Sequence, residues 1–590
     1  MKNIKEDEKL SILNHSCAHL LAQAVKHLYP NAKFWVGPAI EDGFYYDIDL
    51  GDVTLTEEDL PKIEKEMKKC SKSAKNIVKH EISKEEALKE FKDDPYKLDL
   101  ISRMNDKDTI STYTQGDFTD LCRGPHVENT KMIKYFKLTK VSGAYFKGDS
   151  KNKMLQRIYG VCFESEEDLD AYLKEMEEAK ERDHRKIGKD LGIFMMSDLV
   201  GKGLPLYLPN GYTLWRIIQN YITDKEVEHG YLHVHTPDLG SVELYKTSGH
   251  WEHYKDDMFP SMKLDNEEYV LRPMNCPHHM VIYGSKLHSY KDLPIKIAEI
   301  ANDFRYEAAG AVKGIERARC FTQNDSHIFC RPDQIALEFK DVLNLIIEVY
   351  KDFGIDIKEH EFRLSLRDPD DKNDKYYKDD EMWNTAENAL RNVLNDIGVK
   401  YFEAKGEAAF YGPKLDILIK PAVGNPVAIP TIQLDFLLPK RFNLNYIDEK
   451  GEKKTPIVIH RAILGSLDRF IAFYLEETKG NLPTWLAPEQ IRILPVSTIK
   501  HLDYAKEIEK EFRKNKFRVK IDDREEKVGY KMREAITNKI PYTLVIGDNE
   551  MNDKTVTYRI YGTTDQITVS LNDFIKLVNK DIENKTVRYK

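Results

Sequence analysis

Apolar residues recur at helical spacing in long segments of this chain. In SILNHSCAHLLAQAVKHL, from Ser11 to Leu28, they return every three or four residues, which predicts an amphipathic helix. A charged run from Glu164 to Asp190 has the same spacing, and no Gly or Pro interrupts it before Gly188. Because most of the surface of this run must be solvated, we predict one helix that joins two domains.

The pattern changes twice more along the chain. Strand-like runs such as YVLRPM and VAIPTIQLDF alternate with helical patterns over residues 190–485. Two prolines in NLPTWLAP, residues 481–488, predict a boundary. Residues 488–590 then read strand, helix, strand, helix, strand, which predicts a small α/β domain.

The composition is that of several folded domains. The chain has 590 residues, of which 41% are hydrophobic and 32% charged, and at about 150 residues per domain it predicts roughly four domains. Seven thinly spread cysteines do not resemble a secreted disulfide scaffold. The start MKNIKEDEKL leads into no signal-peptide pattern, and no run of about 18 apolar residues occurs. We therefore expect a soluble cytoplasmic protein with reduced thiols and no membrane segment.

Three histidines and a cysteine form a first candidate site. His15 and His19 lie four residues apart in the predicted helix, so both imidazoles fall on one face. Cys122 and His126 occur in DLCRGPHVENT, where Arg-Gly-Pro predicts an irregular turn. The set matches a tetrahedral zinc site, and it equally matches a metal-free hydrolytic pocket in which imidazoles position water. The residues alone leave both possibilities open.

A second set of potential metal ligands is widely dispersed. Cys276 follows YVLRPMN, His327 lies in FTQNDSHIFC, and His460 ends the apolar run TPIVIH. Since zinc ligands are usually found by short spacing, these residues by themselves favour buried core positions.

Phosphate binding would have to depend on separate arginines. The chain has no GxxxxGK[ST] loop and no GxGxxG after a strand. Arg305 in NDFRYEAAG and Arg469 in LGSLDRF stand out, because a planar guanidinium suits phosphate. A surface ion pair is the alternative for each.

Taken together, the motifs resemble those of one family, the threonyl-tRNA synthetases, which are class II aminoacyl-tRNA synthetases. The similar segments follow the family's order over essentially the whole chain: HSCAHLLAQA, GPAIEDGFYYDID, DLCRGPHVENT, SGAYFKGDSKNKMLQRIYG, RDHRKIGKDL, SGHWEHYKDDMF, RPMNCPHH, FTQNDSHIFC, AFYGPKLDI, IHRAILGSLDRF and LPTWLAPEQ. The resemblance implies an α+β multidomain fold with a class II antiparallel-sheet catalytic core. The implied parts are an α+β editing domain (1–163), a linker helix (164–190), the catalytic domain (191–486) and a C-terminal α/β anticodon-binding domain (487–590).

The resemblance also implies a two-step ligase reaction with editing. Threonine and ATP, the latter with Mg²⁺, form an adenylate, and the threonyl group then moves to the 3′ end of tRNA(Thr). Cys276, His327 and His460 are implied to hold one Zn²⁺ per subunit, with open coordination for the amino and hydroxyl groups of threonine. A site that binds the hydroxyl can reject valine by about 10⁴–10⁵-fold, whereas one missing methylene, as in serine, is worth roughly 10–200-fold. Hydrolysis of seryl-tRNA at a second site is therefore required.

Motif positions imply further site residues. The implied editing pocket, which positions water without a committed metal, comprises His15, His19, Cys122, His126, Lys97, Tyr46 and Asp120. The implied ATP contacts are Arg305 at the α-phosphate and threonine carboxylate, Glu307 and Phe321 at the base, and Arg317 and Arg469 at the γ-phosphate. The residues implied to line the threonine pocket are Gln323, Asp325, Tyr411 and Gln433.

The remaining implied roles concern transfer, assembly and anticodon reading. Lys414 is implied to face the reacting groups, and His250 to relay a proton near the terminal ribose. Pro237 matches the motif 1 proline, which implies a homodimer. Glu550 and Arg559 are implied to read anticodon bases.

The chain also departs from the family pattern. Bacterial members usually begin with a small ubiquitin-like domain, whereas we expect this sequence to start directly at the editing domain. At seven positions the chain has a residue other than the one usual in the family, which puts ribose contacts, motif 2 and anticodon reading in doubt. These residues are Ala428, Pro430, Phe304, Ala308, Asn324, Glu525 and Tyr561.

Two other kinds of function compete with a ligase. An RNA-binding regulator on an inactive synthetase scaffold would be expected to have lost Arg305, Arg469 or a zinc ligand, and the chain keeps them. A stand-alone deacylase would not need the motif set of residues 190–485.

The net charge of −9 leans away from a protein that coats nucleic acid, but it is an average. Residues 491–590 contain 21 basic and 16 acidic residues, a net charge of +5, which leaves −14 for the rest. The basic block is the one that the resemblance assigns to the anticodon, where phosphate contacts need cations.

Overall fold

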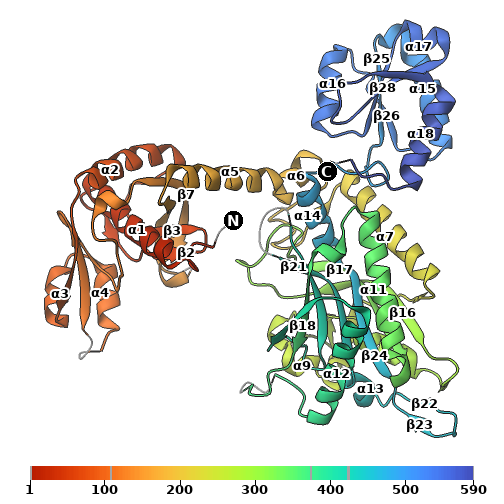
Figure 1. Ribbon diagram of the computed structural model, residues 1–590, viewed down its shortest axis with the longest axis horizontal. Coiled ribbons are helices and arrows are strands. Elements are labelled where there is room, and N and C mark those ends of the chain that lie inside the picture. The colour runs from red at the N-terminus through yellow and green to blue at the C-terminus, as the bar shows by residue number, and fades with distance from the viewer. Residues whose placement is uncertain (1–2, 106–108, 150, 372–374, 422–425, 589–590) are drawn as a thin grey trace. The chain divides into compact units, whose positions relative to one another are not determined.

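The structure is a computed structural model that describes residues 3–105, 109–149, 151–371, 375–421 and 426–588. The chain folds into two compact units, residues 1–179 and residues 180–590. Figure 1 labels many of the helices and strands of both.

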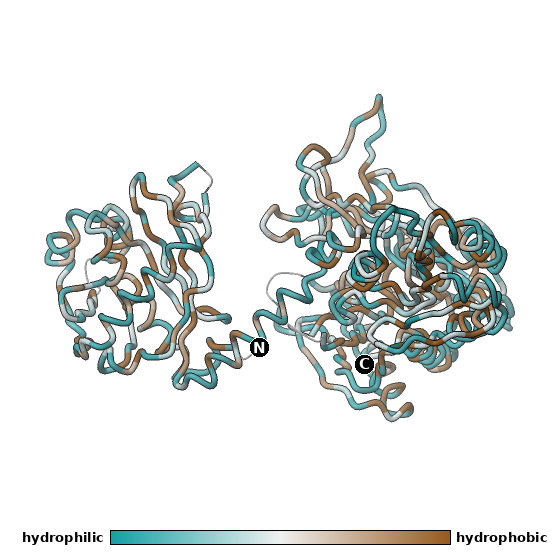
Figure 2. The backbone as a smooth tube through the Cα atoms, turned by 90° about the horizontal axis from the view of Figure 1, so that it is seen from above, coloured by the Kyte–Doolittle hydropathy of each residue, from teal (hydrophilic) through white to brown (hydrophobic). Residues whose placement is uncertain are grey.

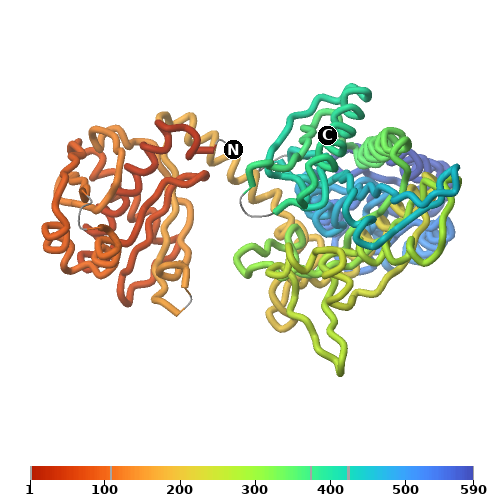
Figure 3. The backbone as a smooth tube through the Cα atoms, turned by 90° about the horizontal axis from the view of Figure 1, so that it is seen from below, coloured from red at the N-terminus to blue at the C-terminus, as the bar shows by residue number. Residues whose placement is uncertain are grey.

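Unit 1 packs a long helix against an antiparallel sheet. Helix α1 (Glu8–Leu28) contacts strands β3 (Gly43–Asp49) and β8 (Met154–Phe163), which pair with each other. The buried Asn14 side chain joins α1 to β8, because it donates to the Cys162 carbonyl and accepts from the Cys162 amide, each at 2.9 Å. Figure 3 shows the later, orange part of this unit beside its red beginning. The expected α+β fold is confirmed.

The other elements of unit 1 complete two sheets. The larger sheet has the order β1-β3-β8-β7 with β2 paired to β3, and the smaller has the order β4-β5-β6. Their strands are β1 (Lys33–Phe34), β2 (Ala39–Ile40), β4 (Ile77–Ile82), β5 (Ile110–Gln115), β6 (Phe118–Leu121) and β7 (Tyr135–Tyr145). The shorter helices are α2 (Leu60–Lys72), α3 (Lys84–Glu90) and α4 (Pro95–Ser102).

The charged run over 164–190 forms two helices, α5 (Glu166–Arg182) and α6 (His184–Asp190). Asp183 between them has φ −56° and ψ 119°, and its carboxylate accepts a hydrogen bond from the Arg185 amide. An aspartate that bonds a backbone N–H in this way starts a new helix. The prediction of one uninterrupted linker helix is therefore wrong.

An eight-stranded sheet forms the centre of unit 2, with the order β11-β16-β17-β24-β21-β20-β18-β19. The strands from β16 to β18 in this order pair antiparallel, and the edge strands β11 and β19 pair parallel. Helices α11 (Ile335–Asp352) and α14 (Leu467–Thr478) pack on it and bury Ile459, Leu464 and Phe470. The antiparallel core expected for class II is confirmed.

The strands of this sheet and the shorter elements around it have the following bounds. The strands of this part are β9 (Phe194–Met195), β10 (Leu206–Tyr207), β11 (Leu232–His233), β12 (Leu239–Ser241), β13 (Met262–Leu264), β14 (Glu267–Leu271), β15 (His288–Ser289), β16 (Ile295–Phe304), β17 (Cys320–Cys330), β18 (Glu361–Leu366), β19 (Tyr401–Lys405), β20 (Lys414–Ile419), β21 (Val427–Asp435), β22 (Tyr446–Ile447), β23 (Lys453–Lys454) and β24 (Ile457–Ser466). The remaining helices are α7 (Pro209–Glu228), α8 (Val242–Ser248), α9 (His250–His253), α10 (Cys276–Gly284), α12 (Asp380–Ile397) and α13 (Leu438–Arg441).

The last hundred residues form an α/β fold around a five-stranded sheet of order β26-β25-β27-β28-β29. Strands β25, β26 and β27 are parallel, and β28 and β29 continue the sheet antiparallel. The predicted alternation of strands and helices is confirmed. The elements are β25 (Ile491–Pro495), α15 (Thr498–Lys514), β26 (Val519–Ile521), α16 (Val528–Thr537), β27 (Tyr542–Ile546), α17 (Asp548–Asp553), β28 (Thr555–Ile560), β29 (Ile567–Ser570) and α18 (Leu571–Glu583).

Hydrophobic and hydrophilic positions alternate along the backbone in both units (Figure 2), as expected where each element has one buried face. Across the described ranges, no helix is both long and apolar enough to cross a membrane.

Candidate functional site

A row of polar side chains crosses the sheet of unit 2. The strand register pairs Lys414 with Gln433, then Gln433 with His460, and His460 with His327. Residues directly opposite each other in antiparallel strands share one face of a sheet. The pairing of β20, β21, β24 and β17 therefore brings together four side chains that are up to 133 residues apart in the numbering.

The three dispersed ligand candidates converge at one end of this row. The ligand atoms of Cys276, His327 and His460 lie within 4.8 Å of one another, and all three residues are buried. Nε2 of His327 has no hydrogen-bond partner among the described residues, and burial holds the pKa of this imidazole well below its usual range. Nε2 of His460 lies 2.8 Å from the Asp435 carboxylate, which leaves Nδ1 available to a ligand. The group has the chemistry of a three-ligand zinc site.

A buried chain of contacts holds the other nitrogen of His327. Its Nδ1 lies 2.8 Å from Nδ1 of His279, whose Nε2 lies 3.2 Å from the Glu299 carboxylate. Glu299 in turn accepts from the Thr236 amide at 2.7 Å. Contacts of this kind orient a metal-binding imidazole. His279 and Glu299 were not predicted as site residues, although the two histidines that follow Cys276 and Pro277 in CPHH were a signal.

Two adjoining pockets open beside the row, and Arg305, Gln323, Lys414 and Gln433 line both. The other predicted residues in the first pocket are Cys276, Asp325, Tyr411 and His460. The other predicted residues in the second are Glu307, Arg317, Phe321 and Arg469, together with Ala428. Pocket residues that were not predicted include Tyr254, Met274, Asp303, Lys375, Thr431 and Arg461. Met274 and Asp303 lie within two residues of the predicted Cys276 and Arg305.

The second pocket gathers positive charge. Burial, and next the charge of Arg305, lowers the pKa of Arg469, whose Nε donates to the Glu316 carbonyl at 3.2 Å. The Arg305 guanidinium lies 5.1 Å from the centre of the Phe321 ring. Arg317 pairs with Glu307 at 2.9 Å. Arginines crowded in one pocket repel each other unless an anion lies between them, so the arrangement suits phosphate.

The first pocket combines a stacked ring with hydrogen-bonding groups. The Tyr411 ring stacks on His460 with centroids 5.0 Å apart, and its hydroxyl donates to Gln433 Oε1 at 2.5 Å. Lys414 Nζ lies 3.1 Å from the Asp416 carboxylate. Burial raises the pKa of Asp325. These polar groups around a small space fit a small polar ligand.

His250 lies outside the walls of both pockets, beside Cys276. It is fully buried, its Nδ1 lies 2.7 Å from the Ser248 hydroxyl, and its Nε2 lies 3.6 Å from Cys276 Sγ. Burial lowers its pKa to about 3. In this structure His250 therefore contacts the Cys276 side of the site and lines neither pocket.

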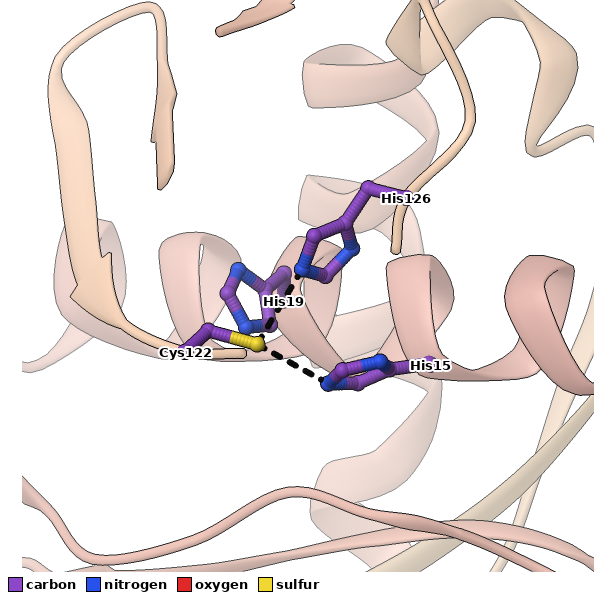
Figure 4. A group of neighbouring side chains, drawn as sticks. All are labelled: His15, His19, Cys122 and His126. Carbon is purple, nitrogen blue, oxygen red and sulfur yellow. Dashed lines mark hydrogen bonds between the residues drawn. The ribbon is translucent and has the colours of Figure 1, made fainter. Parts of the chain in front are cut away.

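The candidates in unit 1 all lie in one cluster. Figure 4 shows His15 and His19 on α1 facing Cys122 and His126. Cys122 Sγ lies 3.1 Å from Nε2 of His15 and 3.3 Å from Nε2 of His126. Burial lowers the pKa of all three imidazoles and raises that of Cys122 to about 11. At neutral pH the cluster therefore has uncharged imidazoles, which can accept a hydrogen bond from water.

A buried carboxylate adjoins this cluster. Asp120 accepts from Lys97 Nζ at 2.5 Å and from the Tyr46 hydroxyl, and it lies 3.6 Å from Nε2 of His19. The seven residues named together for this pocket thus form one connected group. Since the four His and Cys ligand atoms are within 4.8 Å of one another, geometry alone still allows either water or a cation there.

The two anticodon candidates have structural contacts in the C-terminal sheet. Glu550 accepts from the Gly547 amide at 2.8 Å and from the Thr557 hydroxyl at 2.6 Å, so it caps α17. Nε of Arg559 donates to the Thr563 carbonyl. Nearby, Glu525 is exposed and Tyr561 is half-buried.

The other departures lie in or next to the catalytic sheet. Pro430 is buried in β21, where it cannot donate to the ladder. Asn324 is buried and donates to Glu226 at 2.7 Å. Phe304 ends β16, and Ala308 is exposed. Pro237, which matches the motif 1 proline, is exposed between β11 and β12.

Three family models match the chain. The tRNA synthetase class II core domain (G, H, P, S and T) matches residues 259–478, and the anticodon binding domain matches residues 490–581. The Threonyl and Alanyl tRNA synthetase second additional domain matches residues 110–159.

Relatives and solved structures agree with these matches. The chain is 58% identical over 577 residues to a threonine–tRNA ligase of Geobacillus sp. (strain WCH70), covering 98% of this chain and 89% of the relative. It is 57% identical to that of Staphylococcus carnosus, covering 99% and 90%. A crystal structure of the RNA binding domain of threonyl-tRNA synthetase from Cryptosporidium parvum has a TM-score of 0.64 at 37% identity, covering 68% of this chain and 98% of that one. The chain therefore belongs to the threonine–tRNA ligase family of class II aminoacyl-tRNA synthetases.

Proposed function

We propose that threonine binds in the first pocket and ATP in the second, and that the residues shared by both walls hold the reacting groups. As a threonine–tRNA ligase, the chain activates threonine with ATP and transfers it to tRNA. The observation that carries the site assignment is the row of Lys414, Gln433, His460 and His327, which adjoins both pockets. Gln323, Asp325 and Tyr411 then orient threonine.

The arginines of the second pocket bind phosphate. Arg305 lies in both walls, so it can contact the α-phosphate and the threonine carboxylate together. Arg317 and Arg469 take the γ-phosphate side, and Phe321 and Glu307 contact adenine. Lys414 adds positive charge between the two pockets, where negative charge develops at phosphorus. Mg²⁺ accompanies ATP.

Zinc fits the group formed by Cys276, His327 and His460. The unpartnered, buried Nε2 of His327 needs a ligand or hydrogen bond, and the thiol and imidazole set suits zinc. When bound, zinc supplies open coordination for the amino and hydroxyl groups of threonine. The chain's own residues then hold the ligands in place, through Asp435 on His460 and His279 on His327.

We expect Cys276→Ser to lose about one zinc ion per chain and to lower threonine-dependent ATP–pyrophosphate exchange by at least about 10²-fold. The physical reason is the loss of the thiolate ligand from a three-ligand site. The measurement combines elemental zinc analysis with the exchange assay on one preparation. Cys330→Ser is a matched control, because Cys330 is also buried and free and lies outside the group. Normal zinc content in Cys276→Ser, or less than about half a zinc ion per chain in the unaltered protein, contradicts the assignment.

Hydrolytic editing of seryl-tRNA belongs to the cluster in unit 1. Neutral His15, His19 and His126 can position water beside the ester. Buried contacts join Lys97, Tyr46 and Asp120 to one another beside these imidazoles. We propose the metal-free alternative, in which the uncharged imidazoles accept hydrogen bonds from the attacking water.

The domain assignment follows the same division. Residues 1–163 are proposed as the editing domain, 164–190 as the linker, 191–486 as the catalytic domain and 487–590 as the anticodon-binding domain. Glu550 and Arg559 remain candidates for base contacts, although both have contacts within the domain. A cytoplasmic location is part of this proposal, because aminoacyl-tRNA is consumed there by ribosomes.

A homodimer through the β11–β12 region completes the proposal. Around the exposed Pro237, the apolar side chains of Val227, Leu232 and Leu239 are exposed, and β11 is an edge strand. Exposed apolar residues on a sheet edge are typical of an interface. We expect Leu232→Arg to shift the protein from dimer to monomer in size-exclusion chromatography with light scattering.

The matched control for the dimer is Ile499→Arg, which places the same charge at another exposed apolar residue, in the C-terminal domain. It should leave the dimer intact. A Leu232→Arg variant that remains dimeric would show that the interface lies elsewhere.

A further inference from the structure

Unit 1 contains a second group of metal-ligand side chains, separate from the editing cluster. Nδ1 of His27 lies 3.2 Å from Oε1 of Glu66 and 3.6 Å from Sγ of Cys70, and the three ligand atoms lie within 4.8 Å of one another. They come from two helices. His27 is in the last turn of α1, and Glu66 and Cys70 lie four residues apart on α2, which places both on one face.

The second nitrogen of His27 is held in the way that metal-binding imidazoles are held. Its Nε2 lies 3.0 Å from the Asp117 carboxylate, and Gln23 donates to that carboxylate at 2.8 Å. With a cation bound, the proton of Nε2 would be shared with Asp117 and the lone pair of Nδ1 would face the ion between Glu66 and Cys70. A carboxylate behind a histidine is the usual partner that fixes the tautomer of a zinc ligand.

The group also has room for an ion and its remaining ligands. His27, Glu66, Cys70 and Asp117 line one pocket, in which Cys70 is buried and His27 is about one-third exposed on its side chain. Oε2 of Glu66 accepts from Lys69 Nζ at 2.6 Å, so Oε1 faces the other two ligand atoms. A proton on Nδ1 could join His27 to one acceptor, whereas a cation joins all three atoms at once.

We propose that His27, Glu66 and Cys70 form a second zinc-class metal site that clips α1 to α2. The cysteine and histidine favour a borderline-soft divalent cation such as Zn²⁺ over Mg²⁺ or Ca²⁺. Asp117 lies in the turn between β5 and β6, and β6 leads directly to Asp120 and Cys122. The clip therefore ties α2 to α1, which carries His15 and His19, and through Asp117 to β6, which carries Asp120. It lies three helical turns along α1 from His15.

The test counts zinc in full-length variants purified at low free zinc. If Cys276, His327 and His460 also hold zinc, the unaltered protein contains about two ions per chain, and His27→Ala and Cys276→Ser each lose a different one. The double variant His27→Ala/Cys276→Ser then contains neither. Cys70→Ala provides a second variant of the new site, and it should match His27→Ala in zinc content.

Two controls keep the result specific. His80→Ala removes an exposed histidine of the same unit and should leave the zinc content unchanged. Cys122→Ser alters the editing cluster, and loss of zinc in this variant but not in His27→Ala would place the ion there and overturn the proposal. Unchanged zinc content in both His27→Ala and Cys70→Ala would equally overturn it.

Thermal unfolding supplies a readout that does not depend on activity. In the Cys276→Ser background, a chelator should lower the unfolding temperature and added Zn²⁺ should restore it, because an ion that binds only the folded state stabilises it. With His27→Ala added, neither treatment should have an effect. An equal chelator response in both backgrounds would contradict a clip at His27.

Discussion

Replacing Arg305 by alanine should lower the rate of threonine-dependent ATP–pyrophosphate exchange by about 10²–10³-fold, the usual cost of removing one donor aimed at developing negative charge. Arg305 lines both pockets and is therefore the one motif arginine positioned to contact both substrates. Arg305→Lys should recover only part of the rate, since it restores the charge without the planar guanidinium.

Arg391→Ala is the matched control for this experiment. Arg391 pairs with Glu403 at 2.8 Å on the outside of the catalytic domain, away from both pockets. Its exchange rate should equal that of the unaltered protein. If Arg305→Ala retained exchange within about threefold of that rate, the assignment of Arg305 to the reacting phosphate would be wrong.

The double substitution His15→Ala/His19→Ala should abolish hydrolysis of seryl-tRNA, with a fall of about 10²–10⁴-fold, and leave threonylation unchanged. The cause is the loss of the two α1 imidazoles, of which His15 contacts Cys122 and His19 lies beside Asp120. The measurement is the decay of preformed seryl-tRNA, with the rate of threonylation followed in parallel.

His80→Ala again serves as a control for histidine loss in the same unit. Because His19 is almost fully buried, the single variant His15→Ala and a thermal unfolding curve separate lost chemistry from lost folding. Hydrolysis that continues at the normal rate in a folded double variant would move the editing chemistry to other residues.

The helix and strand patterns predicted much of the fold. The spacing in residues 11–28 predicted α1, and the apolar run around His460 predicted β24, because periodicity is a local property of the chain. The linker was predicted as a single helix, although it breaks at Asp183. Spacing alone does not show whether an aspartate will cap a new helix.

Fewer of the contacts in the candidate site could be predicted from local sequence patterns. By their spacing alone, Cys276, His327 and His460 were interpreted as buried core residues, and only the family resemblance indicated a zinc site. Residues so far apart in the chain show no local pattern that predicts their contact. His279 follows Cys276 closely in CPHH, but no sequence pattern indicates that it contacts His327, which lies 48 residues further along the chain. His250 was expected near the terminal ribose, and the structure places it against Cys276.

The sequence by itself determined the element types, the basic C-terminal block and, through its ordered motifs, the family. These depend on local spacing and on residue identity, which need no coordinates. Only the tertiary structure decided which residues meet. Strand register aligned Lys414, Gln433, His460 and His327 across one sheet, and helix packing brought His27 to Glu66 and Cys70. Such contacts join residues far apart in the chain, and they arise from packing of whole elements.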